Sequence, residues 1–231
     1  MINIHSQILF EDNHLLIVNK LPKQLTQGDN TKDLSLIDAL KNYLKLKYNK
    51  KGNVFIGLAN RLDRPCSGIV VFAKTSKALG RVNKMFQKNE IDKKYWAITL
   101  EKIIPDEGDM INYLKKNSTK NKSFIVDKQE GGKYAELKYK FLLNSDSYNL
   151  YDVALITGRH HQIRVQFANA GAPLKGDIKY GFKRPNNDGS VHLHAVSISF
   201  KHPISNEIIN IEAKPPEDNL WNFFSENIIH F

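Results

Sequence analysis

The sequence predicts an α+β fold built around a mixed β-sheet. Short runs of aromatic and β-branched residues recur along most of the chain, whereas few segments show helical periodicity. The chain has 231 residues, of which 41% are hydrophobic and 25% are charged. A chain of this length buries roughly 70% of the surface that its unfolded form exposes, so it can be held together by a hydrophobic core.

The first 90 residues are expected to hold both strands and helices. Apolar runs flank a polar Asp-Asn pair near the N-terminus, and apolar residues then recur at helical spacing from Leu36 to Leu44. The expected elements are a hairpin over 7–20, a helix from Ser35 that fades before 49–53, strands over 54–58 and 69–73, and a helix capped by Ser76 that buries Leu79, Val82, Met85 and Phe86.

The rest of the chain is expected to be richer in strands. A short helix over 161–170, ended by Gly171, should bury Ile163 and Phe167. The Lys-, Asn- and Gly-rich stretch 106–133 predicts a mobile hairpin or a boundary between lobes. The expected strands cover residues 94–100, 134–143, 148–156 and 191–200.

Charge and composition narrow the class of partner. The 34 Lys and Arg residues exceed the 24 Asp and Glu residues, so the formal net charge is +10. This charge favours a polyanion such as RNA, although a lysine-rich solvated surface would give the same balance. The longest apolar runs are too short for a membrane span, no secretory signal is visible, and Cys66 has no second cysteine. We therefore expect a cytoplasmic protein without disulfides or a membrane partner.

An aspartate between two arginines is the first candidate for chemistry. Residues 60–68 read Asn-Arg-Leu-Asp-Arg-Pro-Cys-Ser-Gly, which places Asp63 between Arg61 and Arg64 on a loop between two expected strands. A carboxylate in a positive field stays ionised and can serve as a base or a nucleophile. The tetrapeptide Arg-Leu-Asp-Arg by itself would more often be a surface ion-pair cluster that adds little to stability.

A second motif follows about a hundred residues later. Residues 157–164 read Thr-Gly-Arg-His-His-Gln-Ile-Arg. In this order and at this separation, the two stretches resemble the catalytic loop and the later basic motif of the RluA-like family of RNA pseudouridine synthases. The segments Lys-Lys-Tyr-Trp-Ala-Ile at 93–98 and Gly-Asp-Ile-Lys-Tyr-Gly at 176–181 extend the resemblance.

The resemblance implies a role for each of the following residues. Asp63 corresponds to the catalytic aspartate, which attacks or deprotonates the target nucleotide. Tyr95 corresponds to the tyrosine that stacks on the target uracil, and Arg164 to the basic residue that pairs with the catalytic aspartate. Arg61 corresponds to the arginine that replaces the flipped base in the stack. With Arg61, the expected RNA-binding residues are Arg64, Arg159 and His161, of which the last two could instead brace their loop.

The resemblance also implies an architecture and a partner. It predicts one catalytic domain over residues 1–231, with no accessory RNA-binding domain in front, and a mostly antiparallel sheet with peripheral helices and a central cleft. The substrate would be ribosomal or transfer RNA. The isomerisation is redox-neutral, so no metal and no nucleotide or other cofactor is expected, and the protein is expected to be a monomer.

Two other interpretations stay open at this point. A metal-dependent RNA hydrolase is suggested by four histidines and an aspartate, although no established metal motif is present; these residues are His160, His161, His192, His194 and Asp177. A non-catalytic RNA-binding module is suggested by departures from the family pattern. Asn60 stands where the family usually has histidine, and Cys66 stands where it usually has threonine. Residues 20–23, Lys-Leu-Pro-Lys, only loosely resemble the family's N-terminal turn.

Overall fold

Two structural units make up the chain in a computed structural model that describes residues 4–28 and 33–228. The first unit contains the chain up to Ile91 together with Val196–Lys214, and the second contains Asp92–Ala195 and the chain from Pro215 onward. No helix within the described ranges is long and apolar enough to cross a membrane.

The first unit is built on antiparallel strands. β2 pairs with β1 on one side and with β4 on the other, and β11 pairs with the second half of β10. All seven residues of β4 are buried, which explains the continuous apolar run in the sequence. The strands are β1 (Ile8–Glu11), β2 (Leu15–Lys20), β3 (Gly57–Leu58), β4 (Ser67–Ala73), β11 (Ile208–Glu212) and the part from Val196 onward of β10 (Leu193–Lys201).

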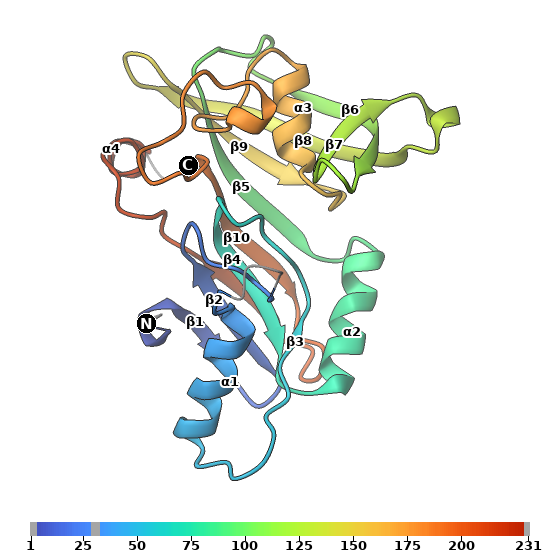
Figure 1. Cartoon of the computed structure of the whole chain (residues 1–231), viewed down its shortest axis with the longest axis vertical. Coiled ribbons are helices and arrows are strands. Elements are labelled where there is room, and N and C mark those ends of the chain that lie inside the picture. Colours follow the sequence, from blue (N-terminus) through green and yellow to red (C-terminus); the bar gives the residue numbers. More distant parts are fainter. Residues whose placement is uncertain (1–3, 29–32, 229–231) are drawn as a thin grey trace. The chain divides into compact units, whose positions relative to one another are not determined.

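Two helices belong to the first unit, α1 (Leu36–Lys47) and α2 (Ser76–Gln87) (Figure 1). A capping box starts α1, because the Ser35 hydroxyl accepts from the Asp38 amide while the Asp38 carboxylate accepts from the Ser35 amide. A short 3₁₀ helix, η1 (His5–Gln7), precedes β1.

The second unit contains a five-stranded antiparallel sheet in the order β5-β9-β8-β6-β7. α3 (Gln162–Asn169) packs against β6 and β7 through Val165, which joins a core cluster with Leu114, Ala135 and Tyr180 (Figure 1). The remaining elements are β5 (Asp92–Thr99), β6 (Glu107–Asn117), β7 (Lys122–Val126), β8 (Lys133–Asn144), β9 (Asn149–Leu155), the 3₁₀ helices η2 (Lys128–Glu130) and η3 (Ile178–Tyr180), and α4 (Asn219–Asn227).

The α+β class and the mostly antiparallel pairing are confirmed, while several local expectations change. The cap of α2 is Thr75 rather than Ser76, because the Thr75 hydroxyl accepts from the Ala78 amide. The strand expected over 54–58 is reduced to the two residues of β3. The stretch 106–133 does form a hairpin, but the units divide at Ile91, Ala195 and Lys214 instead.

Candidate active site

Asp63 lies half-buried on the loop between β3 and β4, as the sequence predicted. The Cys66 amide donates to the Asp63 carbonyl at 3.0 Å, which closes a tight turn around the carboxylate-bearing residue. The turn leads into Gly68, whose φ of 114° is a conformation that favours glycine. The glycine that ends the motif is thus required by the backbone where β4 begins.

Asn60, one of the departures from the family pattern, anchors the start of this loop. Its Oδ1 accepts from the Val71 amide at 2.7 Å, and its Nδ2 donates to the Ile69 carbonyl at 3.4 Å. Both partners belong to β4, which follows the loop. The side chain therefore closes the loop on itself, and asparagine does this with one acceptor and one donor.

Lys20, at the end of β2, holds the same loop through its side-chain ammonium. Its side chain is fully buried, and its ammonium donates to the carbonyls of Leu21 at 3.0 Å, Arg64 at 3.1 Å and Cys66 at 2.5 Å. Burial lowers the pKa of Lys20 to about 8, against the raising effect of Cys66 and Asp63. Sequence reasoning did not predict this supporting role, because two of the three partners, Arg64 and Cys66, lie more than forty positions away.

The two arginines beside Asp63 differ in their surroundings. The Arg64 guanidinium donates through Nε to the Lys23 carbonyl at 3.1 Å and through Nη2 to the Asp33 carboxylate at 2.5 Å. The side chains of this ion pair are about half exposed, so the pair contributes little to the stability of the fold. It does orient the Arg64 guanidinium. Arg61 is exposed.

Tyr95 lies on β5 with 8% of its surface exposed. Its neighbour Trp96 faces the other side of the strand and packs against a cluster that includes Ile98, Leu150 and Phe224. Of Tyr95 and Trp96, it is therefore Trp96 that packs against this core cluster.

Arg164 is buried on α3, with 5% of its side chain exposed. Nε donates to Oδ2 of Asp177 at 2.7 Å and Nη2 donates to Oδ1 at 2.8 Å, a bidentate pair in which the Asp177 side chain is 1% exposed. The guanidinium carbon also lies 5.2 Å from the centre of the Tyr180 ring. The sequence singled out Arg164, considered Asp177 only as a turn residue or metal ligand, and did not predict that Asp177 and Tyr180 are the partners of Arg164.

Arg159 and His161 both lie just before α3, and His161 is its N-cap residue. Arg159 is exposed, and its Nε donates to the Tyr134 carbonyl at 2.8 Å. His161 is buried, has a φ of 56°, and places Nδ1 2.9 Å from the Tyr180 hydroxyl. Its ring stacks on His160 at 3.8 Å. These contacts favour bracing of the loop, the second of the two roles considered for His161.

The residues that suggested a metal site have other partners. Asp177 pairs with Arg164, and His192 lies 2.8 Å from Nδ2 of Asn186 and 3.2 Å from the Asp218 carboxylate. Among the residues that the structure describes, no group of three or more His, Cys, Asp or Glu side chains could hold a metal ion.

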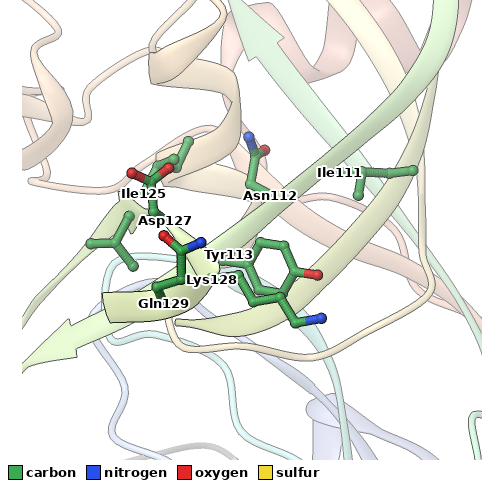
Figure 2. A pocket seen from close by; sticks show the side chains of 8 residues that line it. Ile111, Asn112, Tyr113, Ile125, Asp127, Lys128 and Gln129 are labelled. Carbon is green, nitrogen blue, oxygen red and sulfur yellow. The ribbon is translucent and has the colours of Figure 1, made fainter. Parts of the chain in front are cut away.

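A hollow of about 540 Å³ lies beside β6 and the end of β7 (Figure 2). Tyr113 and Lys128 lie side by side at one edge, with the ammonium 6.0 Å from the ring centre. None of the seven catalytic or RNA-binding residues predicted from the sequence lines this hollow. The lining residues are Ile111, Asn112, Tyr113, Ile125, Val126, Asp127, Lys128 and Gln129.

Comparisons with known proteins agree with the motifs. Residues 14–169 match the family described as RNA pseudouridylate synthase. A ribosomal large subunit pseudouridine synthase C from Rickettsia felis is 34% identical over 90% of this chain and 67% of its own length. A ribosomal large subunit pseudouridine synthase D from Zymomonas mobilis is 29% identical over 94% of this chain and 71% of its own length.

Solved structures show the same fold. The human RNA Pseudouridylate Synthase Domain Containing 4 has a TM-score of 0.79 at 23% identity, covering 96% of this chain and 93% of the human chain. These findings support the enzyme interpretation, and they support neither the non-catalytic module nor the metal-dependent hydrolase. The chain belongs to the RNA pseudouridylate synthase family, whose members isomerise uridine to pseudouridine in RNA.

Proposed function

We propose that this enzyme converts specific uridines of ribosomal RNA to pseudouridine, with Asp63 as its catalytic carboxylate. The observation that carries the proposal is the position of Asp63, on a loop that Lys20 and Asn60 hold from two sides. A carboxylate held in place acts without a reorganisation cost during the reaction. The names of the matched relatives favour ribosomal over transfer RNA as the substrate.

In the proposed reaction the uracil N1–C1′ bond breaks, the base rotates, and a C5–C1′ bond forms. C5 loses its proton and N1 gains one, so atoms and electrons balance without an external oxidant or reductant. Asp63 either adds to C1′, forming an ester bond that breaks when C5 bonds to C1′, or removes a ribose proton to give a glycal and returns that proton when C5 bonds to C1′; both are ordinary carboxylate chemistry.

We assign supporting roles to the other residues. Tyr95 offers an aromatic face, which suits every orientation of a rotating base. Arg61 lowers the cost of flipping the nucleotide, about a few kcal/mol, by taking the place of the expelled base. Arg164 supplies a guanidinium to the catalytic carboxylate, and Arg64 and Arg159 contact RNA phosphates. His161 supports the Arg159 loop.

Replacement of Asp63 with asparagine tests the proposal. Asp63→Asn should bind RNA as the parent does but form no pseudouridine, because the amide is neither a base nor a nucleophile. Pseudouridine mapping of cellular RNA, with the gene absent, restored or carrying this change, measures the reaction and names the uridine. Asp106→Asn, which changes an exposed carboxylate paired with Lys102, is the matched control and should restore the modification.

Retained modification in Asp63→Asn cells would reject Asp63 as the catalytic group. Loss of modification at a transfer RNA position would correct the substrate. We further propose that the enzyme is a monomer and acts in the cytoplasm, where ribosomal RNA would be met. Sedimentation of the purified chain, alone and with RNA, measures the first of these.

A further inference from the structure

Arg164 is held from two directions by a single turn. Asp177 accepts two hydrogen bonds from the guanidinium, at 2.7 and 2.8 Å, while the guanidinium carbon lies over the Tyr180 ring, 5.2 Å from the ring centre. A planar fork that is bound by two hydrogen bonds along one edge and by a cation–π contact to a ring can neither swing nor rotate without losing a contact. Both partners come from residues 176–181.

The turn itself is constrained by its backbone. Gly176 has a φ of 84°, and a Cβ at this position would lie 2.5 Å from the Ser190 carbonyl oxygen, so a larger residue does not fit. The Asp177 carbonyl accepts from the amides of Tyr180 at 3.1 Å and Phe182 at 3.0 Å. Asp177 and Tyr180 are therefore parts of one hydrogen-bonded turn.

The Tyr180 hydroxyl links the turn 176–181 to other elements of the second structural unit. It accepts from the Ser123 amide at 2.8 Å, at the start of β7, and lies 2.9 Å from His161 Nδ1, directly before α3. The hydroxyl thus joins the turn to a strand and to the helix that carries Arg164. All of these groups are buried.

The stability of the folded protein does not by itself explain why Arg164 and Asp177 form a buried ion pair. A buried ion pair costs so much desolvation that apolar residues of similar volume often give an equally stable or a more stable protein. A fixed guanidinium, in contrast, presents its donors to a reacting group without having to be ordered first. We propose that residues 176–181 are a positioning element for Arg164 in the isomerisation, with Asp177 and Tyr180 as positioning residues.

This inference rests on the proposed role of Arg164. Two replacements of Asp177 separate positioning from charge compensation. Asp177→Asn keeps the shape but removes the charge and one acceptor, whereas Asp177→Glu keeps the charge but moves the carboxylate by one methylene. Positioning predicts that both lower kcat, on the order of 10²-fold for a displacement of about 1 Å. RNA affinity should stay unchanged, because the loss is confined to the transition state.

The outcomes are distinguishable. A kcat for Asp177→Glu within about 2-fold of the parent, measured as single-turnover pseudouridine formation, would show that the pair only compensates charge and would overturn the inference. Asp109→Asn makes the same charge change in an exposed pair with Lys138 and should leave kcat unchanged. Activity surviving in Asp63→Asn would instead reject the proposed function, whatever the Asp177 variants do.

A measurement on the parent protein keeps the inference testable should the variants fail to fold. The Arg164 Nε–H group, identified by its absence in Arg164→Lys, should give a nitrogen-15 side-chain signal that exchanges slowly with water and shows restricted rotation, both before and after RNA is added. Rapid exchange and free rotation of this group without RNA would overturn the inference.

Discussion

At the scale of single residues, the buried ammonium of Lys20 shows how the loop carrying Asp63 is supported. Its three donors meet three carbonyls, so none of its N–H groups needs water. The cost is desolvation of a charge, which lowers the pKa of Lys20 from 10.5 to about 8. Lys20 is thus a support for the loop that carries Asp63.

This lowered pKa predicts a pH-dependent stability. In the folded state Lys20 releases its proton near pH 8, whereas the unfolded chain holds it up to about pH 10.5, so stability rises with pH across this window. Relative to Lys20→Met, the parent should gain up to about 3 kcal/mol of unfolding free energy between pH 8 and 10.5. Denaturant titrations at several pH values measure this difference.

An exposed lysine provides the control for Lys20. Lys41→Met removes an exposed lysine of α1 and is measured over the same pH range. A difference in unfolding free energy between the parent and Lys20→Met that does not change from pH 8 to 10.5 would show that the ammonium is not desolvated as described.

At the scale of elements, Glu11 on β1 joins α1 to the strands within the first unit. Burial raises its pKa, but donors at Lys47, Lys74, Tyr48 and Tyr43 outweigh this effect and lower the pKa to about 2. The four contacts have lengths of 2.7 to 2.9 Å. One carboxylate thus joins a strand, a helix and the segment after β4.

The depressed pKa of Glu11 predicts acid sensitivity. Its stabilising contribution is complete above pH 4.5 and is lost as the pH falls toward 2, where the folded protein also takes up the proton. Relative to Glu11→Gln, the parent should lose about 1 to 3 kcal/mol of unfolding free energy between pH 5 and 2, a range discounted because Lys47 is partly exposed. Acid titrations followed by circular dichroism measure the loss. Glu101→Gln, a change at an exposed position, is the matched control, and a Glu11→Gln variant whose unfolding free energy falls as steeply with acid as that of the parent would contradict the prediction.

At the scale of the whole molecule, the net charge of +10 governs the encounter with RNA. Binding should weaken steeply with salt, with a slope of log affinity against log salt of about −0.7 per contacted phosphate for single strands. Asp63→Asn allows this to be measured by filter binding or fluorescence without turnover. An unrelated RNA of equal length should give a similar slope at lower affinity, because phosphate contacts carry no sequence information. Binding that is insensitive to salt would contradict the electrostatic mode.

Local signals predicted much of what the structure contains. The apolar run of β4, the periodicity of α1 and the gap between β3 and β4 that holds Asp63 depend on neighbouring residues, so they could be read directly. The cap of α2 moved from Ser76 to Thr75 because adjacent hydroxyls offer the same chemistry and only the entry angle of the backbone selects one.

The sequence by itself determined the α+β class and the family, since both depend on residue type and order along the chain, and the residues proposed to carry the chemistry stay a prediction from its motifs. Only the tertiary structure decided that Lys20 supports the Asp63 loop and that Asp177 and Tyr180 hold Arg164. A buried charge takes its partners from whatever the fold brings within hydrogen-bonding distance, and that distance in space leaves no trace in the local pattern of the chain.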